Sequence, residues 1–245
     1  DAALALDQQD EAAEAGIQMS NFLFGSCRHS DVMEIGNNIL RGQPDRLRPE
    51  TIVHVWVMMG SASFHIGDFK QALGFAQKAI ELDDEVNCTH MAPAAGADPA
   101  IVARDYVEMA SRVLGHLDRS LSVSEESMAI ALNRGHLFSI VWASVSRVAA
   151  LAGFGRYAEA VACADHAIEI CERYGFNSRI GNVLLHRGPP LFELGEEERG
   201  LADIQRGVTL WRERSGIFIL PRNLARLAEY HLRANQHEQA RASLR

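Results

Sequence analysis

Ten histidines and four cysteines give this sequence many side chains of the kind that bind metal ions. A zinc site on a helix needs two ligands four residues apart on one face and a third ligand close by, and the sequence contains no such set. The nearest approach is Cys88 and His90 in the stretch CTH. One cysteine with one histidine is more typical of a loop than of a metal site, so we predict neither a metal nor any other cofactor.

Residues suited to acid–base or nucleophilic chemistry are present, but no arrangement singles any of them out. A catalytic triad is defined by geometry, and serine, histidine and aspartate are too frequent here to identify one. The carboxylates from Glu196 to Glu198 stand at the expected start of a helix, where negative side chains favour the positive end of the helix dipole. The chain lacks the phosphate-binding loop G-x-x-x-x-G-K-[ST]. We therefore predict no catalytic residue in this chain.

Pro189 and Pro190 fall inside a segment with helical periodicity. Because a proline has no amide donor, we expect the carbonyls of Leu185 and His186 to lose their helical partners and the helix to bend. Free carbonyls in a bent helix could line a ligand pocket. A tolerated kink that only adjusts the packing is the interpretation we favour.

Composition limits the partners that this chain can have. The formal net charge of -8 disfavours nucleic acid, since a phosphate backbone is bound by a net positive surface. No apolar run reaches the roughly 18 residues that a membrane-spanning helix needs, and the first residues do not resemble a signal peptide. The four cysteines lack the paired spacing of disulfide-stapled domains. Together these features predict a cytoplasmic location without membrane contact.

The elements that would position functional side chains recur along the chain. Residues 65–82, HIGDFKQALGFAQKAIEL, contain a turn followed by a helix with one apolar face. This pattern recurs along the chain, each time beginning with a turn residue. In the copies that match best, a small residue follows five positions after the turn residue. The turn residues are Cys27, Gly67, Gly115, Gly155, Gly195 and Asn235. The small residues include Ala72, Ala160 and Gly200.

Successive turn residues are 40 positions apart, except for the 48 between Gly67 and Gly115. A fixed period of this length, with one helical hairpin per unit, is typical of a solenoid, whose hairpins bury their apolar faces against their neighbours. The sequence therefore predicts an all-α solenoid of about six hairpins, forming one repeat domain over residues 1–245. The approximate repeats are 5–42, 48–84, 98–134, 137–174, 177–214 and 217–245, with an insertion loop at 85–97.

The opening repeat resembles the tetratricopeptide-repeat family. The matching positions are Trp56, Met59, Gly60, Gly67, Phe69, Ala72, Ala76 and Ala79. The next two copies depart from the pattern, with Glu108 and Val148 at the position of Gly60, and the 40-residue period exceeds the usual 34. The resemblance implies a tetratricopeptide-like, right-handed superhelix.

The order of longer phrases resembles the C-terminal repeat region of multidomain bacterial signalling proteins. These phrases are HLFSIVWASVSRVAALAGFGRYAEAV, RGPPLFELGEEERGL and GVTLWRERSGIFILPRNLARLAEYHLRANQHEQA. Such proteins join a class III adenylate or guanylate cyclase, or a LuxR-type DNA-binding domain, to an AAA/STAND-like ATPase and then to repeats of this kind. The resemblance implies that this chain is a fragment of a longer protein.

The resemblance also implies a binding surface, because the first helix of each repeat lines the concave face of a tetratricopeptide solenoid. The residues expected there are His54, Phe64, Asp105, Arg112, Trp142, Asn182, Phe192, Arg222 and Glu229. Aromatic groups mixed with Arg or Asn suit a peptide or small-molecule partner. Burial of Trp142 and Phe192 against neighbouring repeats is an equally open alternative, and Trp211 is expected to pack between repeats.

These features together predict a non-catalytic module that binds a protein, a peptide or a small effector. It would regulate an attached cyclase, ATPase or transcription regulator in bacterial signal transduction. The alternative is an oligomerisation scaffold, such as a homodimer. An enzyme with its own active site in the groove is the less favoured third interpretation.

Overall fold

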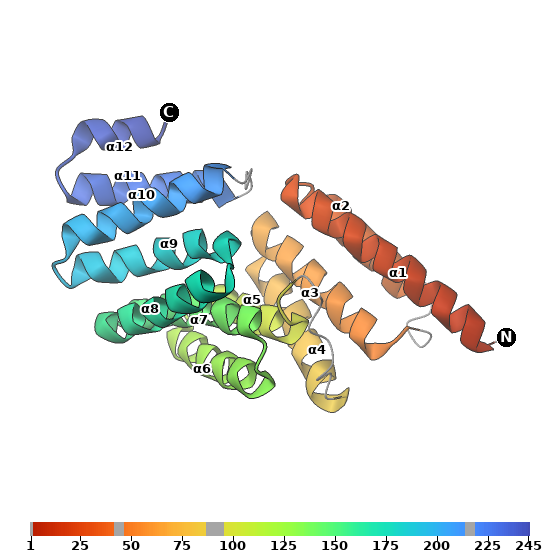
Figure 1. The fold of residues 1–245 in the computed structure, drawn as a ribbon. Coiled ribbons are helices and arrows are strands. Elements are labelled where there is room, and N and C mark those ends of the chain that lie inside the picture. The colour runs from red at the N-terminus through yellow and green to blue at the C-terminus, as the bar shows by residue number, and fades with distance from the viewer. Residues whose placement is uncertain (1, 42–46, 87–95, 214–218) are drawn as a thin grey trace. The chain divides into compact units, whose positions relative to one another are not determined.

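The computed structural model describes residues 2–41, 47–86, 96–213 and 219–245 (Figure 1). Over this part the chain forms twelve α-helices and no strand, which confirms the prediction of an all-α fold. The helices are α1 (Ala2–Gly25), α2 (His29–Arg41), α3 (Pro49–Ile66), α4 (Phe69–Val86), α5 (Pro99–Val113), α6 (Leu117–Arg134), α7 (Leu137–Gly153), α8 (Tyr157–Tyr174), α9 (Asn177–Glu193), α10 (Glu197–Glu213), α11 (Leu220–Arg233) and α12 (His237–Ser243). None of these helices is long and apolar enough to cross a membrane.

A residue with positive φ closes each helical hairpin. Four of these residues are glycines, whose lack of a side chain permits the left-handed conformation without strain. They are Gly67 (φ 96°), Gly115 (φ 82°), Gly155 (φ 72°) and Gly195 (φ 86°). The remaining two turns use Cys27 (φ 60°) and Asn235 (φ 58°), the only described non-glycine residues with positive φ. The six turn residues that recur in the sequence therefore all adopt the left-handed backbone conformation.

The helices divide into two compact units, residues 1–134 and 135–245. In the first unit the first helices of the hairpins, α1, α3 and α5, pack in sequence, and α2 and α4 each also contact the helix that follows. Its core includes Val55, Met59, Ala62 and Ala72, all buried. The insertion expected at 85–97 falls mostly on residues 87–95, outside the described part of the chain.

Small residues bring the helices of the second unit close together. Ala160 and Ala164 on α8 are fully buried. Between α9 and α10 the contact is closer, because a Cβ atom on Gly188 would lie 2.6 Å from the carbonyl oxygen of Gly200. A Cβ on Gly200 would lie 2.6 Å from the carbonyl oxygen of Gly188. Only glycine fits at this crossing, since real Cβ atoms do not approach an oxygen so closely.

Candidate functional site

His54 lies on α3, the first helix of its hairpin, near the acidic residues Glu14 and Asp98. Burial lowers the pKa of the His54 imidazole, and the negative charges of Asp98 and Glu14 oppose this effect only in part. The surroundings of His54 therefore favour its neutral form. Glu14 on α1 accepts a hydrogen bond from Nη2 of Arg48 at 2.7 Å, and Asp98 caps α5 by accepting from the amide of Ala100 at 2.9 Å.

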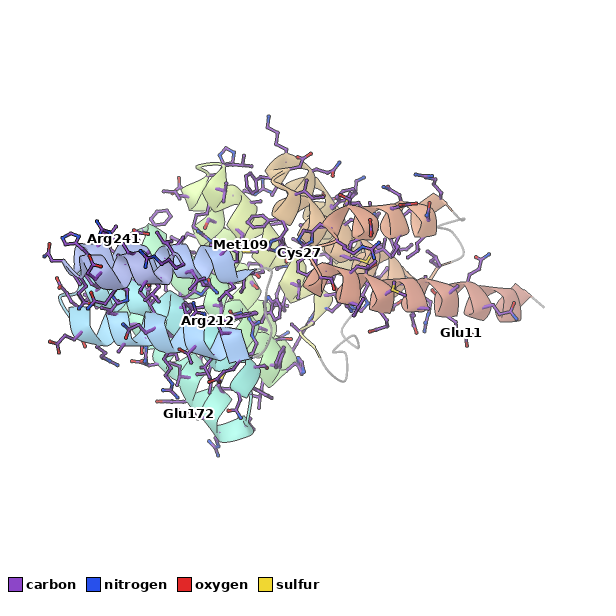
Figure 2. The ribbon with its side chains drawn as sticks, turned by 90° about the horizontal axis from the view of Figure 1, so that it is seen from above. Glu11, Cys27, Met109, Glu172, Arg212 and Arg241 are labelled. Carbon is purple, nitrogen blue, oxygen red and sulfur yellow. The ribbon has the colours of Figure 1, made fainter. Side chains whose placement is uncertain are left out.

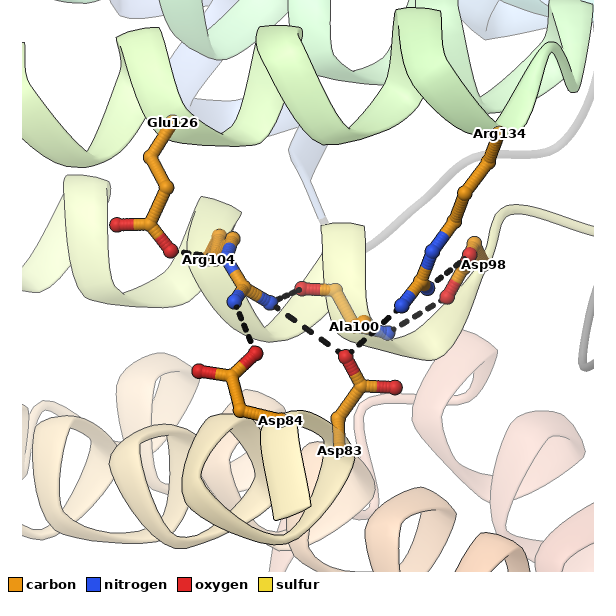
Figure 3. A network of polar contacts seen from close by, with 7 residues as sticks. All are labelled: Asp83, Asp84, Asp98, Ala100, Arg104, Glu126 and Arg134. Atoms are coloured by element: carbon orange, nitrogen blue, oxygen red, sulfur yellow. Dashed lines mark hydrogen bonds and ion pairs between the residues drawn. The ribbon is translucent and has the colours of Figure 1, made fainter. Parts of the chain in front are cut away.

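Two arginines, the buried Arg104 and the half-buried Arg134, join α4, α5 and α6 (Figure 3). Arg104, with 1% of its side chain exposed, donates from Nε to Glu126 at 2.7 Å and from Nη2 to Asp84 at 2.9 Å. Its Nη1 lies 3.8 Å from Asp83 Oδ2. Arg134 on α6 donates to Asp83 at 3.1 Å and to Asp98 at 2.5 Å. The two guanidinium groups thus tie the end of α4 to the start of α5.

This network compensates an unfavourable helix end. Asp83, Asp84 and Glu85 stand in the last turn of α4, where the helix dipole disfavours negative charge. Burial raises the pKa of the Asp83 carboxyl, while Arg134 and then Arg104 favour its charged form. Asp83 Oδ1 is buried and has no hydrogen-bond partner among the described residues. The arrangement fixes the three helices relative to one another.

The other expected site residues of the first unit are largely committed to packing. The Phe64 ring contacts the rings of Phe69 and Tyr106, with centroids 5.2 and 5.8 Å apart. Arg112 donates from Nε to the buried carboxylate of Glu108 at 2.9 Å. Asp105 is half-buried on α5. The structure does not bring Phe64 and Arg112 together with His54 into one polar site.

In the second unit, Trp142 and Asn182 belong to one local cluster on α7 and α9. The guanidinium carbon of Arg179 lies 3.9 Å from the centroid of the Trp142 ring and 5.9 Å from that of Phe138. Arg179 is itself buried and stands three residues before Asn182. Such cation–π contacts fix the plane of the indole. Trp142 remains half-buried, so part of its ring is accessible.

Asn182 is oriented by a second tryptophan. Nε1 of Trp211 donates a hydrogen bond to Asn182 Oδ1 at 2.8 Å, across 29 positions of sequence. This bond fixes the amide so that Nδ2 is its donor end. Nδ1 of His186, one turn further along α9, lies 2.8 Å from the carbonyl oxygen of Asn182. Trp211 thus links the two helices of its own hairpin and positions a polar residue, and it also packs against the buried cluster that includes Leu185 and Leu227.

The structure shows Phe192 in the buried position that the sequence left open as an alternative, and it locates Arg222 and Glu229. Phe192 is buried, and its ring contacts the Tyr230 ring with centroids 5.1 Å apart. It therefore belongs to the core and cannot line an open surface, because α11 covers it. Arg222 and Glu229 are both exposed on α11.

The two prolines of α9 do not interrupt the helix, which continues to Glu193. The carbonyl of Leu185, which Pro189 deprives of its helical donor, accepts a hydrogen bond from Nη1 of Arg226 on α11 at 2.9 Å. This carbonyl is therefore held by a neighbouring repeat and is not free for a ligand. The sequence allowed us to predict that the Leu185 carbonyl lacks its helical donor, because residue 189 is proline. Nothing in the sequence indicated that Arg226 would replace that donor.

Cysteines and metal-ligand types form no site in the described part of the chain. No group of three or more His, Cys, Asp or Glu residues among the described ones is placed to hold a metal ion. Cys88 and His90 lie outside that part. Burial raises the pKa of the Cys171 thiol to about 11, whereas Cys163 is only half-buried and Cys27 is exposed.

Comparison with known proteins identifies one tetratricopeptide repeat by sequence and a similar fold over most of the chain by structure. Residues 53–85, most of α3 and α4, match the tetratricopeptide-repeat family. No curated protein matches the sequence. The fold is similar to that of the apo form of RapI, with a TM-score of 0.74 at 13% identity, covering 96% of this chain and 81% of that one.

Two further similar structures were solved with bound peptides. NprR in complex with its cognate peptide NprX has a TM-score of 0.65 at 12% identity, over 96% of this chain and 65% of that one. Bacillus thuringiensis PlcR in complex with the peptide PapR7 and DNA has a TM-score of 0.61 at 16% identity, over 96% of this chain and 74% of that one. These likenesses establish the tetratricopeptide-like helical-repeat fold predicted from the sequence.

Proposed function

We propose that this chain is a non-catalytic peptide-binding module and that the first-helix face of α7 and α9 holds the peptide. The observation that carries the proposal is the Trp142–Asn182 cluster, in which Arg179 fixes the indole and Trp211 fixes the amide. A preset aromatic ring supplies contact area at little entropic cost, and a preset amide donates to a peptide carbonyl. Trp and Arg are also the residue types most enriched in binding hot spots.

The fold supports the same function by analogy. NprR and PlcR, which share the helical-repeat fold, have been solved with peptides bound. In the proposed mechanism, a peptide favours one arrangement of the packed helices, and an attached domain responds to that shift. The attached domain would be a nucleotide cyclase, an ATPase or a transcription regulator of a bacterial signalling protein, acting in the cytoplasm.

Selection from a random peptide library on the immobilised chain tests this proposal, followed by calorimetry with the enriched peptides. Asn182→Asp keeps the oxygen that accepts from Trp211 but loses the amide donor, so we expect at least about tenfold weaker binding. Trp142→Ala should weaken binding at least as much. The matched control is Phe154→Ala, which removes an exposed aromatic ring from the residue that follows α7 and should leave affinity unchanged.

Two results would refute the proposal. One is a library that yields no specific peptide although the chain is folded by circular dichroism. The other is a set of peptides whose affinity is the same for the wild type, Asn182→Asp and Trp142→Ala. Native mass spectrometry of the purified chain gives an independent readout, because a co-purifying peptide would be released on gentle denaturation.

A further inference from the structure

The first helix carries apolar residues on two opposite faces. One face of α1 is buried against α2 and α3 and includes Ala13, Ile17 and Leu23. The opposite face carries Met19, with 54% of its surface exposed, and Phe22, with 70% exposed. A helix that is apolar on both faces is normally covered on both. Figure 2 labels Glu11 in the first half of this helix and Cys27 in the turn that follows it.

The exposed apolar residues follow the spacing of a helix–helix seam. Ala12, Ala15, Met19 and Phe22 are all exposed and are separated by three, four and three residues. This alternation is the pattern by which one helix packs along another, with side chains of each helix filling gaps in its partner. An extended peptide strand, whose side chains repeat every two residues, does not match it. The surface thus fits a second α-helix.

The order of sizes along the seam fits the same helix in a second copy. Two small residues, Ala12 and Ala15, are followed by two large ones, Met19 and Phe22. When two such helices run antiparallel about a two-fold axis between Ala15 and Met19, each Phe22 lies against an Ala12 and each Met19 against an Ala15. Every bulky side chain then meets a small one, so the face is complementary to itself.

Charge along the seam permits this pairing. The residues beside Met19 and Phe22 are the uncharged Gln18 and Asn21, both exposed, so two copies meet there without like-charge repulsion. Glu11 of one copy comes near the uncharged Leu23 and Phe24 at the C-terminal end of the other helix, and Arg28 beyond that end is already paired with Asp31. Neither end of the pair places two carboxylates against each other.

We propose that the chain forms a homodimer through an antiparallel α1–α1 contact centred between Ala15 and Met19. The proposal goes beyond peptide binding and does not rest on it, because α1 lies in the first unit and the peptide cluster in the second. The surface assigned to the second copy is the face formed by Ala12, Ala15, Met19 and Phe22.

Sedimentation velocity of the whole chain over a range of concentrations tests the contact. The wild type should pass from 27.0 kDa to twice that mass as concentration rises. Ala15→Arg and Phe22→Glu should weaken dimerisation at least about tenfold, with unchanged circular dichroism because both positions are exposed in the monomer. The matched control is Ala158→Arg, at an exposed alanine of α8, which should dimerise like the wild type.

Disulfide trapping tests the antiparallel register. In a Cys27→Asn and Cys88→Ser background, in which asparagine suits the left-handed turn at residue 27, Ala15→Cys and Met19→Cys chains are oxidised separately and as a mixture. A covalent dimer should form in the mixture and in neither chain alone. A wild type that stays monomeric up to about 1 mM, seam variants that dimerise like the wild type, or cross-linking of Ala15→Cys with itself would each overturn the proposal.

Discussion

Replacing Arg226 with methionine tests how the chain tolerates a proline inside α9. Nη1 of Arg226 donates to the carbonyl of Leu185, whose helical donor is missing because residue 189 is proline. Methionine keeps most of the apolar stem and removes the donor. A buried carbonyl left without a partner costs about 1–3 kcal/mol. Since Leu185 is buried and Arg226 is half-buried, we expect a loss of about 1–2 kcal/mol in the free energy of unfolding.

The cost should vanish when the helical donor is restored. In a Pro189→Ala background, the amide of residue 189 can bond to the Leu185 carbonyl as in any α-helix. Arg226→Met should then cost less than about 0.5 kcal/mol. The two substitutions therefore have a predicted coupling energy of about 1–2 kcal/mol, well above the additivity error of about 0.5 kcal/mol.

Urea denaturation followed by tryptophan fluorescence measures this cycle in the relevant unit. Of the three tryptophans, Trp142 and Trp211 lie in the second unit, so a Trp56→Phe background makes the signal report that unit alone. The control is Arg206→Met, which removes an exposed arginine of α10 in the same unit and should change stability by less than about 0.5 kcal/mol. Equal costs of Arg226→Met in the proline and alanine backgrounds would refute the reasoning.

Three further outcomes follow from burial. Ala160→Phe should overpack the contact made by α8 and lower the free energy of unfolding by about 1–3 kcal/mol in urea; a neutral result would place Ala160 at the surface. Burial raises the pKa of Asp83, so the native state holds its proton more tightly than the unfolded state. The stability of the wild type relative to Asp83→Asn should thus fall as pH rises from about 4 through the native pKa, and urea titrations that show it rising would contradict this sign. With a colourimetric thiol reagent at pH 8, exposed Cys27 should react in the folded chain, while buried Cys171, with a pKa of about 11, should react only after unfolding; prompt reaction of Cys171 would disprove its burial.

The hairpin architecture was predictable because one local signal repeats. A left-handed turn after each first helix needs a residue that accepts positive φ, and glycine at four of six turns marks the register. The register then locates Cys27 and Asn235, which carry little signal of their own. Both have positive φ in the structure, so position within the repeat was more informative than residue type at these turns.

The contacts that orient the candidate site were not predictable because they join residues far apart in sequence. Arg226 reaches a carbonyl 41 positions away, and Trp211 reaches an amide 29 positions away. Long side chains have many reachable partners, and only the packing of neighbouring helices selects one. The burial of Phe192 was not predictable for the same reason. Its position in the repeat places it on a first helix, but Tyr230 of the next repeat covers it.

The α5–α6 hairpin differs from α9–α10 at the position where the repeat pattern has glycine. Gly188 lets α9 touch the backbone of α10, whereas Glu108 brings a fully buried carboxylate into α5–α6. Glu108 Oε1 accepts from Arg112 and from Ser120, at 2.9 and 2.8 Å. In the described chain, Glu108 Oε2 and the buried Ser111 and Ser127 hydroxyls have no partner, and each such group costs about 1–3 kcal/mol.

This difference predicts unequal local stability along the repeats. Hydrogen exchange read by mass spectrometry should show the amides of α5 and α6 exchanging faster than those of α9 and α10, because opening the polar hairpin returns three buried groups to water. Ser127→Ala, which removes one of the unpartnered buried hydroxyls at nearly constant shape, serves as the matched variant and should slow exchange in α5–α6 while leaving α9–α10 unchanged. Equal protection of the two hairpins in the wild type would refute the cost assigned to the buried, unpartnered groups of α5–α6.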